Sequence, residues 1–187
     1  MLRPFAYLSP IFFLLIFFTA CSNKQRQTSP SPHVEEQSQT SSSLVEMPAL
    51  ENQYTDRLNG HEYLVTISRQ PDETLPKTVD ELGNEYSDNR VDVVITKDGQ
   101  DFFSRTYSKN SFLNMLSESE SLGTVLLGMA YDSQKSNEKI LCLAAQIGQI
   151  GIEEGPAFTI EIPLAGGTPN IQRDMEQDTS GSQDSDL

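Results

Sequence analysis

Two kinds of catalytic chemistry have candidate side chains in this sequence. Glu153 and Glu154 are adjacent acids in a glycine-rich turn, and a pair of carboxylates is what glycoside hydrolysis requires. His61 is the only histidine in the region expected to fold, so a serine–histidine–acid triad would have to use it. No Gly-x-Ser-x-Gly turn is present, although hydrolases of that class need one. We therefore favour a non-catalytic protein and keep a hydrolase with a carboxylate pair as an alternative.

The polar run Asp88, Asn89 and Arg90 is the candidate contact site for a ligand or partner. It directly precedes an apolar, alternating segment. Asp and Asn favour turns because their side chains bond to their own backbone. A turn that starts a strand is therefore the structural interpretation of this run, and a ligand or partner contact is the functional one.

Composition and motifs argue against several other functions. The chain carries 27 acidic against 13 basic residues, for a net charge of −14, and nucleic acid binding calls for a basic surface instead. Neither nucleotide-binding glycine motif is present, and His33 and His61 have no cysteine or histidine at zinc-ligand spacing. We expect no metal, no cofactor and no nucleic acid partner. The acidic surface leaves a second alternative, an inhibitor or immunity-like protein directed against a cationic enzyme.

The first residues have the pattern of an export signal. Arg3 precedes an apolar run at 11–18, which is too short to span a bilayer and typical of a signal peptide. Thr19, Ala20 and Cys21 follow, and this stretch resembles the lipobox of bacterial lipoproteins. The resemblance implies that residues 1–20 are removed and that Cys21 carries acyl chains, which would anchor the protein to a membrane.

The residue after the cysteine bears on location. It is Ser22 and not Asp, and by the sorting rule of Gram-negative lipoproteins this implies the outer membrane. The segment that follows is basic, which favours a periplasm-facing anchor over surface export. The expected partners are the membrane, through Cys21, and an envelope protein, a glycan or a small ligand.

Beyond the signal, composition divides the chain into three parts. Residues 21–47 are rich in Ser, Gln, Thr and Pro, which predicts a flexible tether behind the lipidated cysteine. Residues 54–164 carry most of the apolar pattern and are long enough for one core. Residues 166–187 are acidic and polar, and we predict a disordered tail. Cys142 lies in an apolar run, so we expect it to be buried and inert.

The central part alternates with the period of β-strands. Asp98 and Gly99 separate two apolar runs, a strong signal for a type I′ hairpin. A two-residue turn would pair Lys97 with Gln100, Ile95 with Phe102 and Asp92 with Arg105. The period changes after Tyr107 and predicts one short helix at about 109–116, capped by Ser108. We predict a mainly β fold, an antiparallel sandwich or partly open barrel.

The hairpin and the helix start also carry a family resemblance. Asp88-Asn89-Arg90, the Asp-Gly turn, an aromatic strand and Lys109-x-x-Phe112 look like a family of small Bacteroidetes lipoproteins with a domain of unknown function. The match in motif covers 86–116 and in layout about 60–164. It implies a β-rich domain on a lipid anchor and supplies no catalytic residues. We therefore expect an outer-membrane lipoprotein that acts by binding.

Overall fold

The computed structural model describes residues 44–152 and 154–178. The expected signal at 1–20, Cys21, most of the tether and the last part of the tail lie outside the described residues, as does Glu153. In the described part of the chain, no helix is long and apolar enough to cross a membrane.

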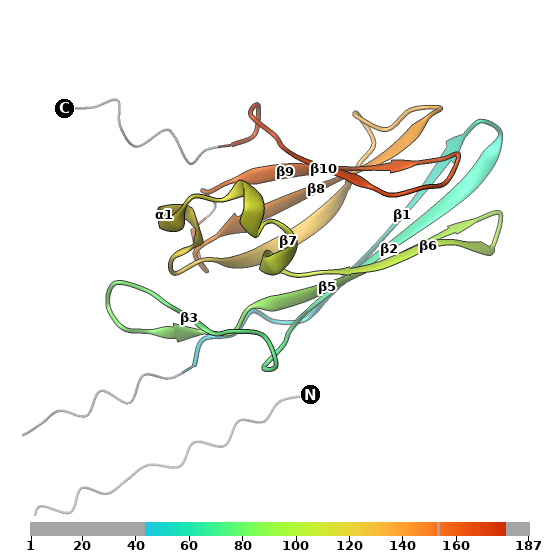
Figure 1. The fold of residues 1–187 in the computed structure, drawn as a ribbon. Helices are drawn as coiled ribbons and strands as arrows, with labels where there is room; N and C mark the ends of the chain where they lie inside the picture. Colours follow the sequence, from blue (N-terminus) through green and yellow to red (C-terminus); the bar gives the residue numbers. More distant parts are fainter. Residues whose placement is uncertain (1–43, 153, 179–187) are drawn as a thin grey trace, which may run out of the picture. The chain divides into compact units, whose positions relative to one another are not determined.

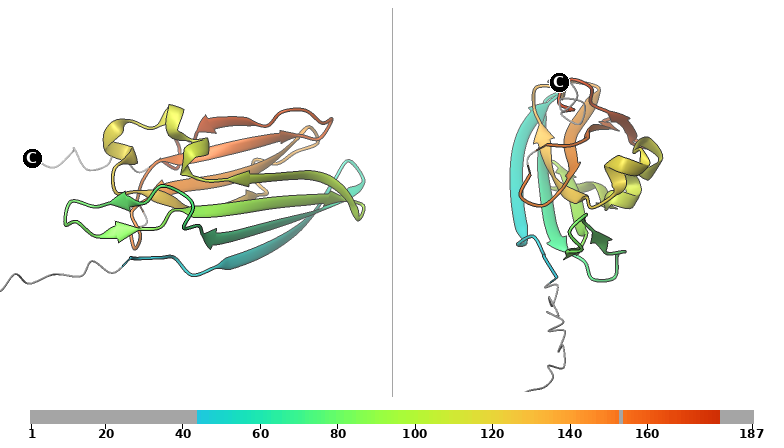
Figure 2. Two further views of the ribbon diagram at one scale, coloured as in Figure 1. Left: turned by 60° about the horizontal axis from the view of Figure 1, so that its bottom comes forward. Right: turned by 90° about the vertical axis from the view of Figure 1, so that its left-hand side faces the viewer.

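Two antiparallel four-stranded sheets face each other (Figures 1 and 2). Sheet 1 has the order β1-β2-β5-β6, and sheet 2 has the order β10-β9-β8-β7. The strands of sheet 1 are β1 (Leu50–Leu58), β2 (His61–Pro71), β5 (Asn89–Lys97) and β6 (Gln100–Tyr107). Those of sheet 2 are β7 (Val125–Asp132), β8 (Ile140–Gly148), β9 (Ala157–Pro163) and β10 (Asn170–Arg173). The predicted mainly β, antiparallel fold is confirmed, and the sheets do not close into a barrel.

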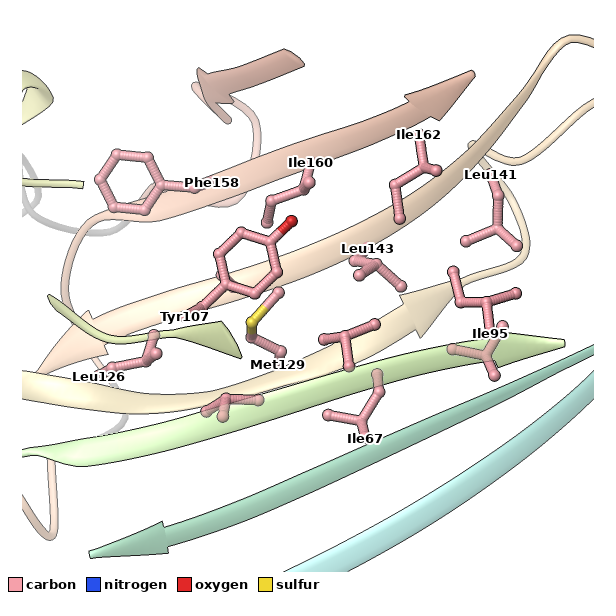
Figure 3. Packing of buried hydrophobic residues seen from close by; sticks show 14 of the residues in the cluster. Ile67, Ile95, Tyr107, Leu126, Met129, Leu141, Leu143, Phe158, Ile160 and Ile162 are labelled. Carbon is pink, nitrogen blue, oxygen red and sulfur yellow. The ribbon is translucent and has the colours of Figure 1, made fainter. Parts of the chain in front are cut away.

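The core lies between the two sheets because each strand turns alternate apolar side chains inward. In sheet 1 the buried set includes Tyr63, Val65 and Ile67 of β2, and β5 contributes every second residue opposite them. Figure 3 shows side chains of β7, β8 and β9 packed against this layer. The buried residues of sheet 2 include Leu126, Met129, Leu141, Leu143, Ile147, Phe158, Ile160 and Ile162.

The β5–β6 hairpin has the predicted turn but not the predicted register beyond it. Asp98 and Gly99 have φ of 51° and 77°, as a type I′ turn requires, and Lys97 pairs with Gln100. The pairing then shifts at a β-bulge, so Ile95 faces Phe103 and Asp92 faces Thr106. The predicted pairs of Ile95 with Phe102 and Asp92 with Arg105 are wrong.

Two adjacent aromatic residues explain the bulge. Strict alternation would turn either Phe102 or Phe103 toward solvent. The inserted residue lets both pack against the core, and the Phe102 ring meets the Tyr63 ring edge-on at 5.6 Å. The bulge therefore exchanges one exposed cross-strand charge pair for the burial of a second aromatic ring.

The helical segment is shorter and later than predicted. Residues 109–116 form two 3₁₀ turns, Lys109–Ser111 and Leu113–Met115, and the only α-helix of the described residues, α1, is Glu118–Ser121. Ser117 starts α1 with a capping box that includes Glu120, because a serine hydroxyl satisfies the free N–H groups of a first turn. Phe112 is fully buried and stacks on Phe158 at 4.9 Å.

Ordered strands extend past both expected ends of the domain. β1 begins at Leu50, and β10 lies within 166–187, where composition predicted disorder. β10 pairs with β9, and Ile171 packs against the core. A short hairpin of β3 (Thr78–Val79) and β4 (Glu85–Tyr86) lies between β2 and β5. These segments are polar in composition, and pairing with a neighbouring strand orders them.

Candidate functional site

Asp88 and Asn89 lie in the core region as a polar bridge between the two sheets. The Asp88 side chain is 2% exposed and that of Asn89 is fully buried. Oδ1 of Asp88 accepts a hydrogen bond from the Leu126 N–H at 2.9 Å, and Nδ2 of Asn89 donates to the Leu126 carbonyl at 2.8 Å. The two side chains thus pair both backbone groups of one residue of β7, as a neighbouring strand would.

Lys109 completes this cluster. Its N–H donates to Oδ2 of Asp88 at 3.3 Å, and its Nζ donates to the carbonyls of Ser121 and Thr124 at 3.1 and 2.6 Å. Burial lowers the pKa of the Lys109 ammonium, and the charge of Asp88 opposes that shift. Lys109 therefore fastens the segment before β7 to sheet 1. We call Asp88, Asn89 and Lys109 the inter-sheet bridge.

Arg90 is the one member of the predicted contact run that faces solvent. Its side chain is 41% exposed, and its guanidinium lies 3.2 Å from Asp92 and 3.7 Å from Asp72. The buried, bonded positions of Asp88 and Asn89 support the structural interpretation of that run. Contact with a partner stays a prediction, and Arg90 is the residue positioned to make it.

A cleft of about 500 Å³ opens at the opposite end of the sandwich. The turns β1–β2, β5–β6 and β9–β10 and the β7–β8 loop come together at this end, as Figure 1 shows. We call it the distal cleft. It is lined by Asn59, His61, Tyr63, Lys97, Glu138, Lys139, Leu164 and Ala165.

Asp98 holds one wall of the distal cleft in place. Its Oδ2 lies 2.6 Å from Nδ1 of His61, and its Oδ1 accepts the Glu62 N–H at 2.9 Å. The Asp98 N–H donates in turn to the Glu62 carbonyl at 2.8 Å. These hydrogen bonds lower the pKa of Asp98, that of the Glu62 N–H having the largest effect. They also join the β1–β2 hairpin to the β5–β6 turn and fix the His61 ring.

Two lysines give the distal cleft a positive rim in an acidic protein. Nζ of Lys97 lies 5.8 Å from the centre of the Tyr63 ring. Lys139 comes from the β7–β8 loop, which Asn59 fixes by donating to the Glu138 carbonyl. Within the part of the chain that the structure describes, neither lysine forms an ion pair with a carboxylate. Their charges are thus available to an anionic group in the cleft.

A second concave surface, on the outer side of sheet 2, is neutralised from within. Lys135 forms an ion pair with Asp174, whose carboxylate also accepts from Thr159 at 3.1 Å. Cys142 borders this surface and is buried as predicted. Burial raises the pKa of the Cys142 thiol to about 11, which suppresses the thiolate needed for reactivity. The lysine of this surface is thus paired with a carboxylate, unlike the two lysines of the distal cleft.

The other chemical candidates do not assemble into a site. Among residues 44–152 and 154–178, no group of three or more His, Cys, Asp or Glu side chains could hold a metal ion. His61 stands at the start of β2 with Asp98 as its partner. Glu154 is exposed, and the carboxylate pair with Glu153 falls partly outside the described residues.

Sequence reasoning considered His61 only as the histidine of a possible catalytic triad and did not identify Lys97 or Lys139 as site residues. Each lysine lies next to a turn or in a loop, where charged residues are common. A usable signal was nevertheless present: the Asn59-Gly60 and Asp98-Gly99 pairs predict two hairpin turns. Hairpins of one sandwich that turn at the same end bring their flanking residues together.

The comparisons with known proteins bear on the family. A comparison with curated proteins finds no match. A family described as a domain of unknown function, DUF4738, matches residues 30–149. That range holds the inter-sheet bridge, the β5–β6 hairpin and both lysines of the distal cleft. The chain therefore belongs to the DUF4738 family, in agreement with the resemblance to a domain of unknown function.

Proposed function

We propose that this protein is a non-catalytic binding lipoprotein of the outer membrane whose distal cleft takes a small anionic ligand. Acyl chains on Cys21 would hold it to the membrane, facing the periplasm. The single observation that carries the binding role is that Lys97 and Lys139, which form no ion pair among the described residues, line a cleft of about 500 Å³ together with one carboxylate, Glu138. Clefts of this size suit small molecules.

The position of the cleft suits an N-terminal anchor. The described chain starts beside the β3–β4 hairpin, where Val45 bridges to Tyr86. From there β1 runs to the turn at Asn59, a length of about 30 Å for nine strand residues. Figure 2 shows the start of the described chain and the β1–β2 turn at opposite ends. The described chain thus enters the sandwich at the end opposite the distal cleft.

The lining indicates the ligand class. Lys97 and Lys139 offer positive charge, and Glu138 offers a carboxylate that can accept from hydroxyl groups. Leu164 and Ala165 supply an apolar wall. An acidic monosaccharide, free or at the end of an envelope glycan, has this combination of a carboxylate, hydroxyls and an apolar ring face. The acidic-inhibitor and hydrolase alternatives stay predictions, and no contact in the distal cleft specifically favours either.

A paired titration tests the proposal. Glucuronate and glucose are added separately to the ¹⁵N-labelled full chain, and the amide resonances are followed by NMR. Glucuronate is expected to shift the amides of Asn59, Lys97 and Lys139, with a Kd of about 1 mM for so small a probe. Glucose should leave them nearly unchanged, since it lacks the carboxylate. Equal shifts with both sugars, or shifts only outside the distal cleft, would contradict the proposal.

A further inference from the structure

The outer edge of β1 differs from the other edges of the two sheets. β6 and β7 carry β-bulges, and β10 has only four residues. β1 is a regular strand of nine residues that pairs with β2 without a register shift. It contains no Pro, Lys or Gly, although proteins commonly use Pro, Lys, bulges or short strands to protect an open edge. β1 is therefore the edge best suited to pair with another strand.

The turn after β1 decides which backbone groups face outward. Asn59 and Gly60 have φ of 54° and 78°, and a two-residue turn of this type closes on a hydrogen-bonded pair, here Leu58 and His61. The alternation along the strand then points the N–H and C=O groups of every second residue away from β2. The outward-facing residues are Glu51, Gln53, Thr55 and Arg57. The Arg57 N–H meets the Asp56 side chain at 2.7 Å, as expected for a group that pairs with no other strand of the described residues on this side.

The sequence of β1 is complementary to itself when reversed. If two copies pair antiparallel about Tyr54, Glu51 faces Arg57 of the second copy. Gln53 faces Thr55, and Leu50, which is 49% exposed, faces Leu58. All four outward-facing residues then lie opposite one another, so their backbone groups form about eight hydrogen bonds.

We infer that β1 is a self-association edge, through which two copies of this chain join their first sheets into one continuous antiparallel sheet. The partner is a second copy because the two charged outward-facing residues are matched by opposite charges in the same strand in reverse. Glu51 and Arg57 lie at opposite ends of β1, about 20 Å apart at the rise of a strand. They cannot meet within one chain, but antiparallel pairing brings them together twice about the symmetry axis.

Other registers lose this match. Sliding the second copy by two residues places Glu51 opposite Thr55, or Gln53 opposite Arg57, and leaves a charge without an opposite charge. Sliding by one residue turns outward backbone groups toward groups already bonded to β2. The centre at Tyr54 is thus the register in which charge, backbone bonding and the full length of β1 agree.

Reversing one charge of β1, or exchanging both charges, tests the proposed dimer directly. Sedimentation velocity is run on the full chain in excess non-ionic detergent micelles, over a range of protein concentrations. Glu51→Arg and Arg57→Glu each replace two attractive contacts with two repulsive ones and should weaken the dimer at least about tenfold. The double variant Glu51→Arg/Arg57→Glu restores opposite charges across the axis and should recover the wild-type dimer within about threefold.

The double charge exchange distinguishes an effect on association from an effect on folding. Arg57 also contacts Glu62 at 3.2 Å within the chain, and this contact is lost equally in Arg57→Glu and in the double variant. Recovery in the double variant therefore reports the second copy, and circular dichroism checks that each variant keeps its fold. Wild-type protein that stays monomeric at every concentration would overturn the inference. So would a dimer that single charge reversals do not weaken, or that the double variant does not restore.

Discussion

Replacing Asp88 with Ala should destabilise the domain severely, although the residue lies far from the distal cleft. Asp88 is 2% exposed, and its carboxylate accepts from the N–H groups of Leu126, Asn89 and Lys109 at 2.9, 2.9 and 3.3 Å. Alanine would leave these groups without an acceptor. It would also leave the half-buried Lys109 ammonium without its neighbouring negative charge.

The structure gives an approximate magnitude. Hydrogen bonds to a charged group contribute about 1.5–3 kcal/mol each, and an unsatisfied buried donor costs about 1–3 kcal/mol. With two well-formed bonds at 2.9 Å, we expect a loss of about 3–5 kcal/mol in the free energy of unfolding. This is a large part of the roughly 5–15 kcal/mol typical of a folded domain.

Urea unfolding followed by far-ultraviolet circular dichroism measures this loss, because the chain has no tryptophan. Asp92→Ala is the matched control. Asp92 lies four residues along the chain on β5, its side chain is 36% exposed, and it contacts Thr106 and Arg90, so its loss should cost less than about 1 kcal/mol. If Asp88→Ala costs no more than Asp92→Ala, the inter-sheet bridge does not hold the sheets together.

Three further predictions concern the side chains of Tyr107, Glu120 and Cys142. The Tyr107 hydroxyl is fully buried and has no hydrogen-bond partner among the described residues. Tyr107→Phe should therefore leave the free energy of unfolding unchanged or raise it by about 1 kcal/mol, and a clear loss in urea unfolding would contradict this. Arg173 lowers the pKa of Glu120 to about 2, so the stability from this pair is complete above about pH 4.5 and is lost as the pH falls toward 2. Unfolding measured from pH 7 to pH 2 should show this loss, about 2 kcal/mol, and Glu120→Gln should remove that part of the pH dependence. The raised pKa of Cys142, about 11, predicts that iodoacetamide at pH 8 modifies this thiol only after unfolding; peptide mass spectrometry locates the label, and rapid native modification would refute the assigned burial.

Local pattern predicted much of this fold. The strand period of the central part and the Asp98-Gly99 turn were predicted correctly, because a short stretch of chain contains the whole signal. The predicted register beyond the turn was wrong, because the β-bulge depends on the packing of the Phe102 ring against Tyr63 of β2, which is distant in sequence.

The strands β1 and β10 also could not be predicted from the local sequence alone. Both are polar segments that become strands by pairing with β2 and β9. Whether these segments form strands depends on neighbours that are distant in sequence. Local composition carries no information about those neighbours. The helix was placed early because Ser108 and Ser117 are both good N-caps: Ser108 precedes the 3₁₀ turn Lys109–Ser111, and Ser117 precedes α1.

The functional residues also differ in whether the local sequence reveals their role. The Asp88-Asn89-Arg90 run was visible as an unusual polar sequence, but only the fold shows that two of its members bond to β7. Lys97 and Lys139 carry no local signal of function, because they are ordinary lysines near turns until the sandwich brings them to one cleft.

The most direct test of the proposed binding role is the affinity of the full chain for glucuronate, with and without the two cleft lysines. Lys77→Gln is the control, since Lys77 is an exposed lysine beside Glu85 at the opposite end of the sandwich. We predict that Lys97→Gln/Lys139→Gln weakens binding at least about tenfold, whereas Lys77→Gln leaves it unchanged within about twofold. Equal affinity in all three proteins would contradict the assignment of the distal cleft as the ligand site.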